Sequence, residues 1–188
     1  PRAAPAGATA LLNAGQTGYF RSRYSPELEA RVTAAFPKLA PEDQLGLIYD
    51  SLALGESGYA PISDFLDVAR HAQGAEDPVV LKALTQQLAR LNDFYEGQPG
   101  EAAFRAFARA RLAPAYARLG WDPKPGEPDN DAVLRRTLLA TLGKLDDPAV
   151  ITEARRRFTA WLAAPHSLTG TSRQTVLQIV ADHADAAT

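Results

Sequence analysis

Hydrophobic residues along most of this chain recur at the spacing of amphipathic helices. After residue 25, apolar side chains fall at i, i+3, i+4 and i+7, which places them on one face of a helix. Several expected helices open with proline at the first helical position, as at Pro26, Pro41 and Pro78, and glycine follows several expected ends. The pattern predicts helices that start near residues 26, 41, 61, 78, 101, 131, 148 and 172.

Two of these expected helices carry features that affect their packing. The helix expected at 101–119 contains Pro114, which should kink it or divide it in two, because proline lacks an N–H and clashes with the preceding turn. In the helix expected from residue 148, the apolar stripe runs through Phe158, Trp161 and Leu162, which should be buried.

The spacing of the expected helices indicates the fold class. Helix pairs recur at roughly 35 to 45 residues, the spacing of HEAT and armadillo stacks, although no motif repeats from pair to pair. The sequence therefore predicts a mainly α protein, an irregular HEAT/armadillo-like superhelix of antiparallel helices covering residues 25–188.

The first 24 residues follow a different pattern. Residues 1–8 are Ala, Pro and Gly with one Arg, which is the composition of a linker. Two short runs follow at 9–13 and 18–24, and in the second Phe20, Ser22 and Tyr24 occupy alternate positions, as in a half-buried strand. We therefore expect a β-strand pair, which is marginal in water by itself and should complete a sheet supplied elsewhere.

A proline-rich loop separates the helices expected at 101–119 and from 131. Three prolines and two glycines surround Trp121, one of only two tryptophans, so neither a helix nor a ladder strand can pass through. We expect Trp121 to be mostly buried as a plug that fixes the angle between the two helices.

Composition and charge limit the possible functions. Hydrophobic residues make up 46% and charged residues 22%, as in an ordinary folded domain, and the formal net charge of −2 gives no general attraction to nucleic acid or to an anionic membrane. No apolar run approaches the roughly 18 residues that span a bilayer. We expect a soluble domain without nucleic-acid partners, whose compartment, cytoplasmic or periplasmic and secreted, stays open.

The residue types that carry catalysis are sparse or isolated. Cysteine is absent, and His71, His166 and His183 are far apart, with no His-Glu-x-x-His pair to hold zinc beside a general base. Phosphate-binding loops and serine nucleophile elbows are absent as well. The sequence therefore predicts no catalytic and no metal-binding residues, and it identifies no substrate-binding residue.

Two clusters of arginine, Arg135-Arg136 and Arg155-Arg156-Arg157, allow alternative interpretations. Arg155, Arg156 and Arg157 spread over about 200° of a helix, and they can serve as solvated residues with local ion pairs such as Glu153 to Arg157 at i+4. Alternatively, some of them contact an acidic neighbour or a ligand carboxylate in the bidentate geometry that arginine prefers.

Several motifs, taken in order, resemble one enzyme family. The run Asn13-Ala-Gly-Gln-Thr-Gly-Tyr-Phe-Arg21, followed by Tyr24, resembles the Asn…Gly-Tyr-Tyr/Phe-Arg-Val-x-Tyr motif of zinc aminopeptidases of the aminopeptidase N type. The segments at 119–127, 134–135 and 153–158 look like puromycin-sensitive aminopeptidase, and Asp50 to Leu54 resembles the Asp-x-x-Ala-Leu helix of the family. Ser22 departs from the pattern, which usually has valine at that position.

The resemblance implies a domain organisation. Residues 1–24 would be a linker and a strand remnant of a preceding β-sandwich domain, and 25–188 would be the C-terminal helical lid domain, truncated at its C-terminal end. The chain also lacks methionine, even at position 1, which fits a fragment of a larger enzyme.

The resemblance also implies a function. The parent enzyme would use zinc to remove N-terminal residues from peptides, and this domain would enclose and gate the peptide chamber beside the catalytic and β-sandwich domains. Because no position here matches the family's catalytic or zinc-binding residues, the chain alone is expected to be inactive. The alternative is a free-standing HEAT-like module that binds a protein partner.

The resemblance also includes Glu127 of the proline-rich loop and Arg135 of the helix expected after it, in addition to Trp121. We expect Glu127 to pair with Arg135 or with nearby backbone amides, and the three residues to form a structural brace. The large-to-small rule for core residues then gives a loss of about 3 to 5 kcal/mol for Trp121→Ala.

Overall fold

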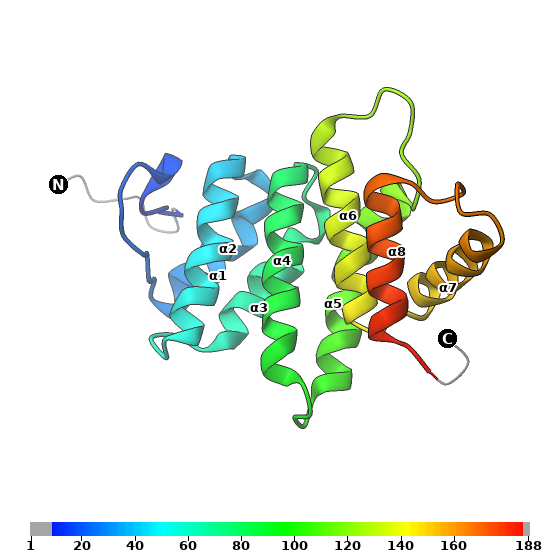
Figure 1. The fold of residues 1–188 in the computed structure, drawn as a ribbon. Coiled ribbons are helices and arrows are strands. Elements are labelled where there is room, and N and C mark those ends of the chain that lie inside the picture. The colour runs from blue at the N-terminus through cyan, green and yellow to red at the C-terminus, as the bar shows by residue number, and fades with distance from the viewer. Residues whose placement is uncertain (1–8, 186–188) are drawn as a thin grey trace. The chain divides into compact units, whose positions relative to one another are not determined.

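The structure is a computed structural model that describes residues 9–185, and within that range it is helical (Figure 1). The α-helices are α1 (Pro26–Ala35), α2 (Pro41–Glu56), α3 (Ile62–His71), α4 (Pro78–Tyr95), α5 (Glu101–Leu119), α6 (Asp129–Lys144), α7 (Pro148–Ala163) and α8 (Gly170–Asp182). Short 3₁₀ turns occur at Ala14–Gln16, Phe36–Lys38 and Ala72–Gly74. The mainly α class is therefore confirmed, and each predicted helix is present with its start within two residues of the expected position.

Caps that are visible in the sequence explain several of these starts. Ser25 accepts a hydrogen bond from the Leu28 amide at 3.4 Å and precedes Pro26 at the start of α1. Asp77 accepts from the Val79 and Val80 amides at 2.8 and 3.1 Å at the start of α4. Each cap supplies an acceptor for amides that have no partner within the helix, so the helix begins there.

The chain divides into two compact units, the first ending at Leu84 and the second beginning at Thr85. In the first unit, α3 packs against both α1 and α2. Its core is built from fully buried side chains on these helices and on the turn after α1. They include Val32, Phe36, Ile48, Leu52, Phe65 and Val68.

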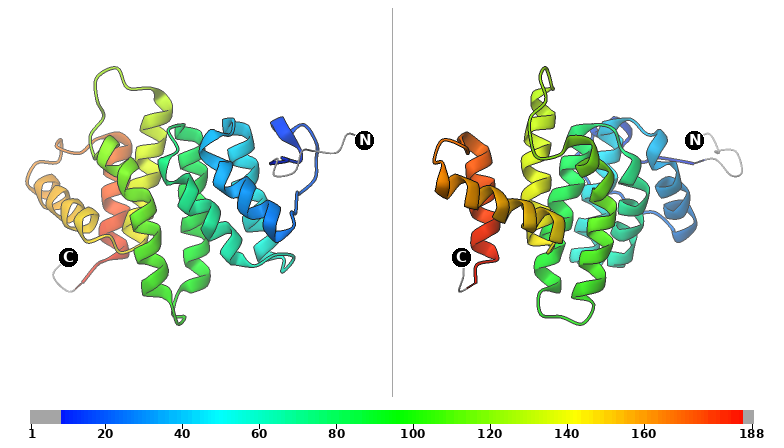
Figure 2. Two further views of the ribbon diagram at one scale, coloured as in Figure 1. Left: turned by 180° about the vertical axis from the view of Figure 1, so that it is seen from behind. Right: turned by 90° about the vertical axis from the view of Figure 1, so that its right-hand side faces the viewer.

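In the second unit, α6 packs against α5, α7 and α8, and α7 also packs against α8. Figure 2 shows α7 and α8 joined by a loop, residues 164–169, that contains a turn. The apolar stripes of these helices meet in a buried core. Its members include Leu112, Leu134, Leu138, Leu142, Leu145 and Ile179.

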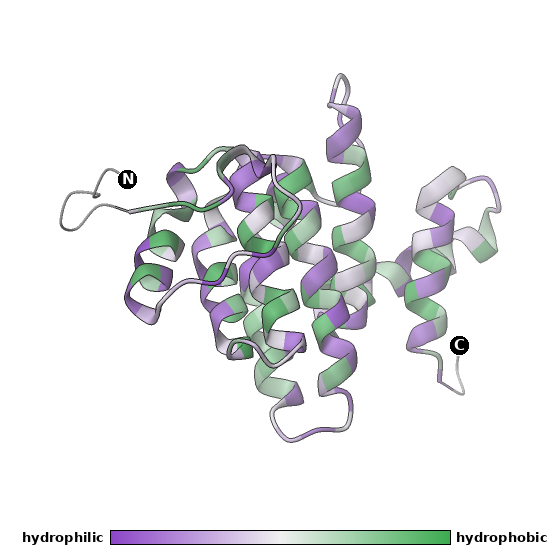
Figure 3. Cartoon of the chain, turned by 90° about the vertical axis from the view of Figure 1, so that its left-hand side faces the viewer, coloured by the Kyte–Doolittle hydropathy of each residue, from purple (hydrophilic) through white to green (hydrophobic). Residues whose placement is uncertain are grey.

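Hydropathy along the helices follows this burial. Figure 3 shows hydrophilic and hydrophobic bands alternating along the helical ribbons, as expected where one face of each helix is buried and the other is solvated. The stripe of α7 is less buried than expected, because Phe158 and Trp161 are only partly covered and Leu162 is 62% exposed. The prediction of a buried Leu162 is therefore wrong.

Pro114 does not divide α5, which runs unbroken from Glu101 to Leu119. Leu112, Ala115 and Leu119 are buried around the proline, so packing holds the chain in the helical path despite the missing amide. Of the two effects predicted for Pro114, division into two helices is therefore wrong, and the kink stays a prediction.

The predicted N-terminal β-strand pair is also wrong for residues 9–24, where the structure has no strand. Asn13, Gly15 and Gln16 have positive φ angles of 53°, 72° and 52°, which an extended strand does not allow. The Asn13 side chain makes two hydrogen bonds with the backbone of Gly18. It accepts from the Gly18 amide at 2.6 Å and donates to the Gly18 carbonyl at 2.9 Å. This local turn replaces the first strand. Residues 1–8, the expected linker, lie outside the described residues.

Carboxylates of α2 take the place of a strand partner for this segment. Asp43 accepts from the Gly15 amide at 2.7 Å, and Asp50 accepts from the Ser22 amide at 2.9 Å and from Arg21 at 2.9 Å. The alternating pattern at 18–24 therefore reflects side chains on a segment that is fastened to α2 rather than a paired strand.

Candidate functional site

The connection between α5 and α6, residues 120–128, projects beyond the ends of the two helices (Figures 1 and 2). Gly120 ends α5 with φ 63° and ψ −161°, a conformation that glycine adopts without steric strain. The Gly120 amide still donates to the Tyr116 carbonyl at 2.8 Å. The chain then leaves the helix into the proline-rich loop that the sequence predicts.

Arg135 of α6 fastens this loop to both helices. Its guanidinium bonds both carboxylate oxygens of Glu127, and the Nη1 to Oε1 distance is 2.5 Å. Its Nε donates to the Leu119 carbonyl at 3.3 Å, which satisfies a backbone acceptor at the end of α5. The expected pairing of Glu127 with Arg135 is confirmed.

The surroundings of Glu127 strongly favour its ionised form. Hydrogen bonds from Arg135 have the largest effect, and the hydrogen bond from the Lys124 amide, at 3.0 Å, has the second largest. Together they lower the pKa of Glu127 to about 2. The Arg135 side chain is only 5% exposed, so its charge is nearly removed from water and needs this partner.

Trp121 lies on the same loop and contacts α7 through Arg157. The guanidinium carbon of Arg157 is 4.9 Å from the centroid of the indole ring, within the range of a cation–π interaction. The same guanidinium makes two bonds of 2.7 Å to Asp122. Trp121 has intermediate exposure, so the indole is partly covered, with Arg157 over its ring.

Arg157 makes the local ion pair of the first interpretation and the bidentate acidic contact of the second, but its side chain is only 16% exposed and so is not solvated. It pairs with Glu153 at 2.8 Å, one helical turn earlier, and it also makes the bidentate contact with Asp122. Arg156 pairs with Glu153 alone among the described contacts, at 2.7 Å. The sequence did not identify the contact between Asp122 of the loop and Arg157 of α7, and the available signal was the preference of arginine for bidentate carboxylate contacts.

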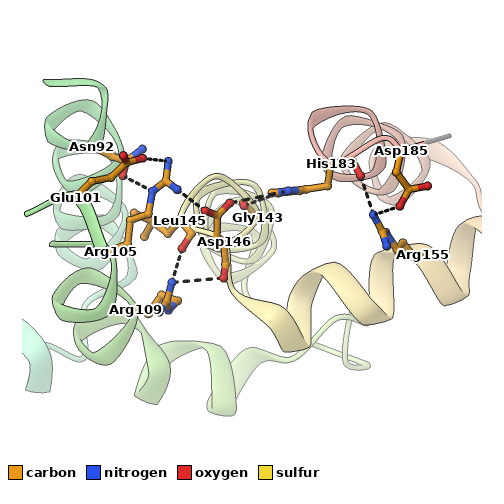
Figure 4. A network of polar contacts seen from close by, with 10 residues as sticks. All are labelled: Asn92, Glu101, Arg105, Arg109, Gly143, Leu145, Asp146, Arg155, His183 and Asp185. Atoms are coloured by element: carbon orange, nitrogen blue, oxygen red, sulfur yellow. Dashed lines mark hydrogen bonds and ion pairs between the residues drawn. The ribbon is translucent and has the colours of Figure 1, made fainter. Parts of the chain in front are cut away.

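A second polar network lies at the turn between α6 and α7 (Figure 4). Arg105 of α5 bonds Asn92 at 3.2 Å and pairs with Asp146, while Arg109 donates to the Leu145 carbonyl at 2.6 Å. His183 lies 2.9 Å from the Gly143 carbonyl and 3.9 Å from the Asp146 carboxylate. These contacts satisfy the carbonyls at the end of α6, so the network is structural.

The geometry provides no centre for zinc among the described residues. No three His, Cys, Asp or Glu side chains in residues 9–185 converge to hold a metal ion. His71 ends α3, where its Nδ1 lies 2.9 Å from the Asp67 carbonyl. A zinc ion does not fit the residues that are present.

Among the described residues, no helix combines the length and the apolar character that a membrane span requires.

Comparison with known proteins identifies relatives along most of the chain. A family model described as the ERAP1-like C-terminal domain matches residues 10–188. Aminopeptidase M1-A of Oryza sativa subsp. japonica is 34% identical over 151 residues, which cover 78% of this chain and 17% of that protein. Aminopeptidase N of Lactococcus lactis subsp. lactis is 28% identical over 170 residues, 88% of this chain and 20% of the relative.

The chain thus spans about a fifth of the length of these relatives. The matched region includes the proline-rich loop and its arginine contacts. The chain belongs to the ERAP1-like C-terminal domain family, and it is a C-terminal domain of an aminopeptidase N-family enzyme.

Proposed function

We propose that this chain is the non-catalytic C-terminal domain of a zinc aminopeptidase, and that it encloses and gates the chamber in which peptides lose their N-terminal residues. The observation that carries the proposal is a match to a C-terminal domain family along residues 10–188, in a sequence without His-Glu-x-x-His. Zinc and the general base would then be supplied by other parts of the parent chain, where they activate water for peptide hydrolysis.

The N-terminal segment supports contact with a preceding β-sandwich domain. Leu12, Tyr19 and Phe20 are 48%, 109% and 58% exposed, although they are large apolar side chains. Adjacent exposed aromatic residues are typical of a surface that another domain covers. In this proposal residues 1–24 connect the β-sandwich domain to the helical domain at 25–188.

An activity assay tests the non-catalytic role. The purified 188-residue chain is incubated with aminoacyl chromogenic substrates, with and without added zinc. No turnover is expected in either condition. Turnover that a chelator abolishes would contradict the proposal.

A stability comparison tests the interdomain contact. Tyr19→Ser with Phe20→Ser should change the stability of the isolated chain by less than about 0.5 kcal/mol, because both side chains are already exposed. The same pair of substitutions should lower the melting temperature of the full-length parent. Equal effects in the two proteins would show that no neighbouring domain covers the segment.

Gating is tested in the full-length parent by a series of peptides of increasing length. Removal of this domain should abolish discrimination by peptide length, since the enclosing wall is lost. The alternative hypothesis, a free-standing HEAT-like module, predicts instead that the open reading frame contains no His-Glu-x-x-His motif upstream of this chain. If the motif is absent there, the alternative is favoured over the proposal.

A further inference from the structure

The first unit contains a cavity of about 490 Å³ between α1, α2 and α3. Residues 22–24 close one side, so the segment that is fastened to α2 forms part of the wall. Apolar groups of Pro26, Leu47, Leu54 and Pro61 line the cavity together with several carboxylates. A cavity with apolar walls and a few polar groups is the usual form of a small-ligand site.

The carboxylates in this cavity differ in their partners. Asp50 accepts from Arg21 and from the Ser22 amide, and Asp67 pairs with Arg70. Glu29 of α1 and Asp64 of α3 make no ion pair within residues 9–185. Arg23 and His71 also line the cavity, and Arg23 is near enough to favour the charged form of Asp64, but neither residue forms an ion pair with Glu29 or Asp64 within residues 9–185.

The pKa values of Glu29 and Asp64 are both raised above the ordinary values of these groups. Burial raises the pKa of Glu29, and the negative charges of Asp64 and Asp50 raise it further. Burial also raises the pKa of Asp64, Asp67 adds to the effect, and Arg23 opposes it. A cation placed between the two carboxylates would relieve both the repulsion and the loss of hydration.

Ser22 provides an independent indication of a ligand. The residue is 7% exposed, and its hydroxyl oxygen has no hydrogen-bond partner among the described residues. Burial raises the pKa of the nearby Tyr24 hydroxyl, whereas the Leu12 amide, which donates to it at 3.0 Å, and the Ser22 hydroxyl act in the opposite direction. A buried hydroxyl without a hydrogen bond is unfavourable, so a donor that enters the cavity would satisfy it.

We propose that this cavity binds the side chain of an arginine or lysine, with the charged group between Glu29 and Asp64 and near the Ser22 hydroxyl. The methylene stem of such a side chain would pack against Leu54 and Pro61, which matches the combination of apolar and acidic walls. A metal ion is a poorer occupant, because no three potential metal ligands converge among the described residues. The inference stands on the first unit alone and does not depend on the proposed function.

The basic side chain has two possible sources, a free peptide or a part of the parent outside these 188 residues. The probe is N-acetyl-arginine N-methylamide, and the control ligand is the citrulline analogue, which has the same length without the charge. Binding is followed by ¹H–¹⁵N chemical-shift changes in the 188-residue chain and by calorimetry in the full-length parent.

The arginine probe should give saturable shifts at the amides of residues 22–24 and 29, and the citrulline analogue should bind at least about tenfold more weakly, a difference of about 1.4 kcal/mol. Glu29→Gln with Asp64→Asn should weaken binding of the arginine probe about tenfold, and Ser22→Ala about threefold. Glu27→Gln is the matched control, because Glu27 lies exposed on the same helix and should leave binding unchanged.

The outcomes separate the two sources and test the proposal. Binding to both the chain and the parent identifies a free basic peptide, whereas binding to the chain alone identifies a side chain of the parent that already occupies the cavity. The proposal is wrong if the arginine probe gives no saturable shifts, if citrulline binds equally well, or if the Glu29 and Asp64 variant, still giving a dispersed spectrum, binds as tightly as the original chain.

Discussion

Arg157 of α7 lies over the indole ring of Trp121, with 4.9 Å between the guanidinium carbon and the ring centroid. The same guanidinium forms two bonds with Asp122, the next residue along the loop. Arg135 of α6 holds the far end of the same loop through Glu127. Two arginines from two helices therefore fix the connection between α5 and α6, and we propose that this connection is a structural brace.

Replacement of Arg157 should loosen the loop at Trp121. Arg157→Ala removes the cation–π contact and the pairs with Asp122 and Glu153, and we expect a loss of about 1 to 2 kcal/mol in the free energy of unfolding. Urea unfolding followed by tryptophan fluorescence measures this loss of stability. Arg156→Ala is the matched control, because Arg156 is 65% exposed and pairs only with Glu153 among the described contacts, so the substitution should leave the urea midpoint nearly unchanged.

Replacement of Arg135 should cost more. The side chain is 5% exposed, and Arg135→Ala removes its bonds to Glu127 and to the Leu119 carbonyl, so we expect a loss of about 2 to 4 kcal/mol in urea unfolding. Arg136→Ala is the control, since the neighbouring residue is exposed. Equal effects of the two substitutions would show that the loop is not held by Arg135.

The acid sensitivity of the fold should depend on Glu127. Its pKa is lowered from an ordinary 4.5 to about 2, chiefly by Arg135, so its contribution to stability is complete above about pH 4.5 and is lost as the pH falls toward 2. The urea midpoint of Glu127→Gln should therefore change less between pH 5 and pH 2.5 than that of the unaltered chain. Parallel pH profiles for the two proteins would contradict this. Glu153, whose pKa is also lowered to about 2, is present in the variant and in the unaltered chain, so both proteins keep the part of the acid sensitivity that comes from Glu153.

The N-terminal segment should detach when Asp50 is replaced. Asp50→Ala removes the bonds to Arg21 and to the Ser22 amide, and we expect trypsin to cleave after Arg21 and Arg23 about tenfold faster, which corresponds to about 1.4 kcal/mol of local stability. Digestion followed by mass spectrometry measures the rates. Glu42→Ala, an exposed carboxylate on the same helix, should leave the cleavage rate unchanged.

The helices could be predicted because their signals are local. Proline and capping residues such as Asp77 lie beside the helix that they start, and the apolar period of 3.6 is visible in each segment. The pairing of Glu127 with Arg135 could be predicted because the family resemblance covers both residues, in the neighbouring segments 119–127 and 134–135. The contact of Arg157 with Trp121 joins residues that are far apart in sequence, so periodicity contained no information about it.

The failures share a physical cause, which is that packing overrides a local pattern. Alternation at 18–24 predicts a strand, but the left-handed conformation at Asn13 and the carboxylates of α2 fix a different path. Pro114 predicts a break, but the buried side chains around it keep α5 continuous. Leu162 continues the stripe of α7 beyond the region where neighbouring helices cover it.

Close packing of α6 against α8 should depend on Gly143. A Cβ atom at this position would lie 2.8 Å from Cγ1 and 3.3 Å from Cγ2 of Ile179, which is buried. Gly143→Ala should therefore destabilise the chain by about 1 to 3 kcal/mol, even though alanine is favoured over glycine in a helix by about 1 kcal/mol.

Two further variants establish that the cause is steric. Gly74→Ala places a methyl group in open space and should be neutral or slightly stabilising. Ile179→Ala creates a cavity by itself, yet the added methyl of Gly143→Ala fills part of that space, so the double variant should lose less stability than the sum of the two single losses. Additive losses would show that Gly143 and Ile179 are not in the close contact that fixes the spacing of α6 and α8.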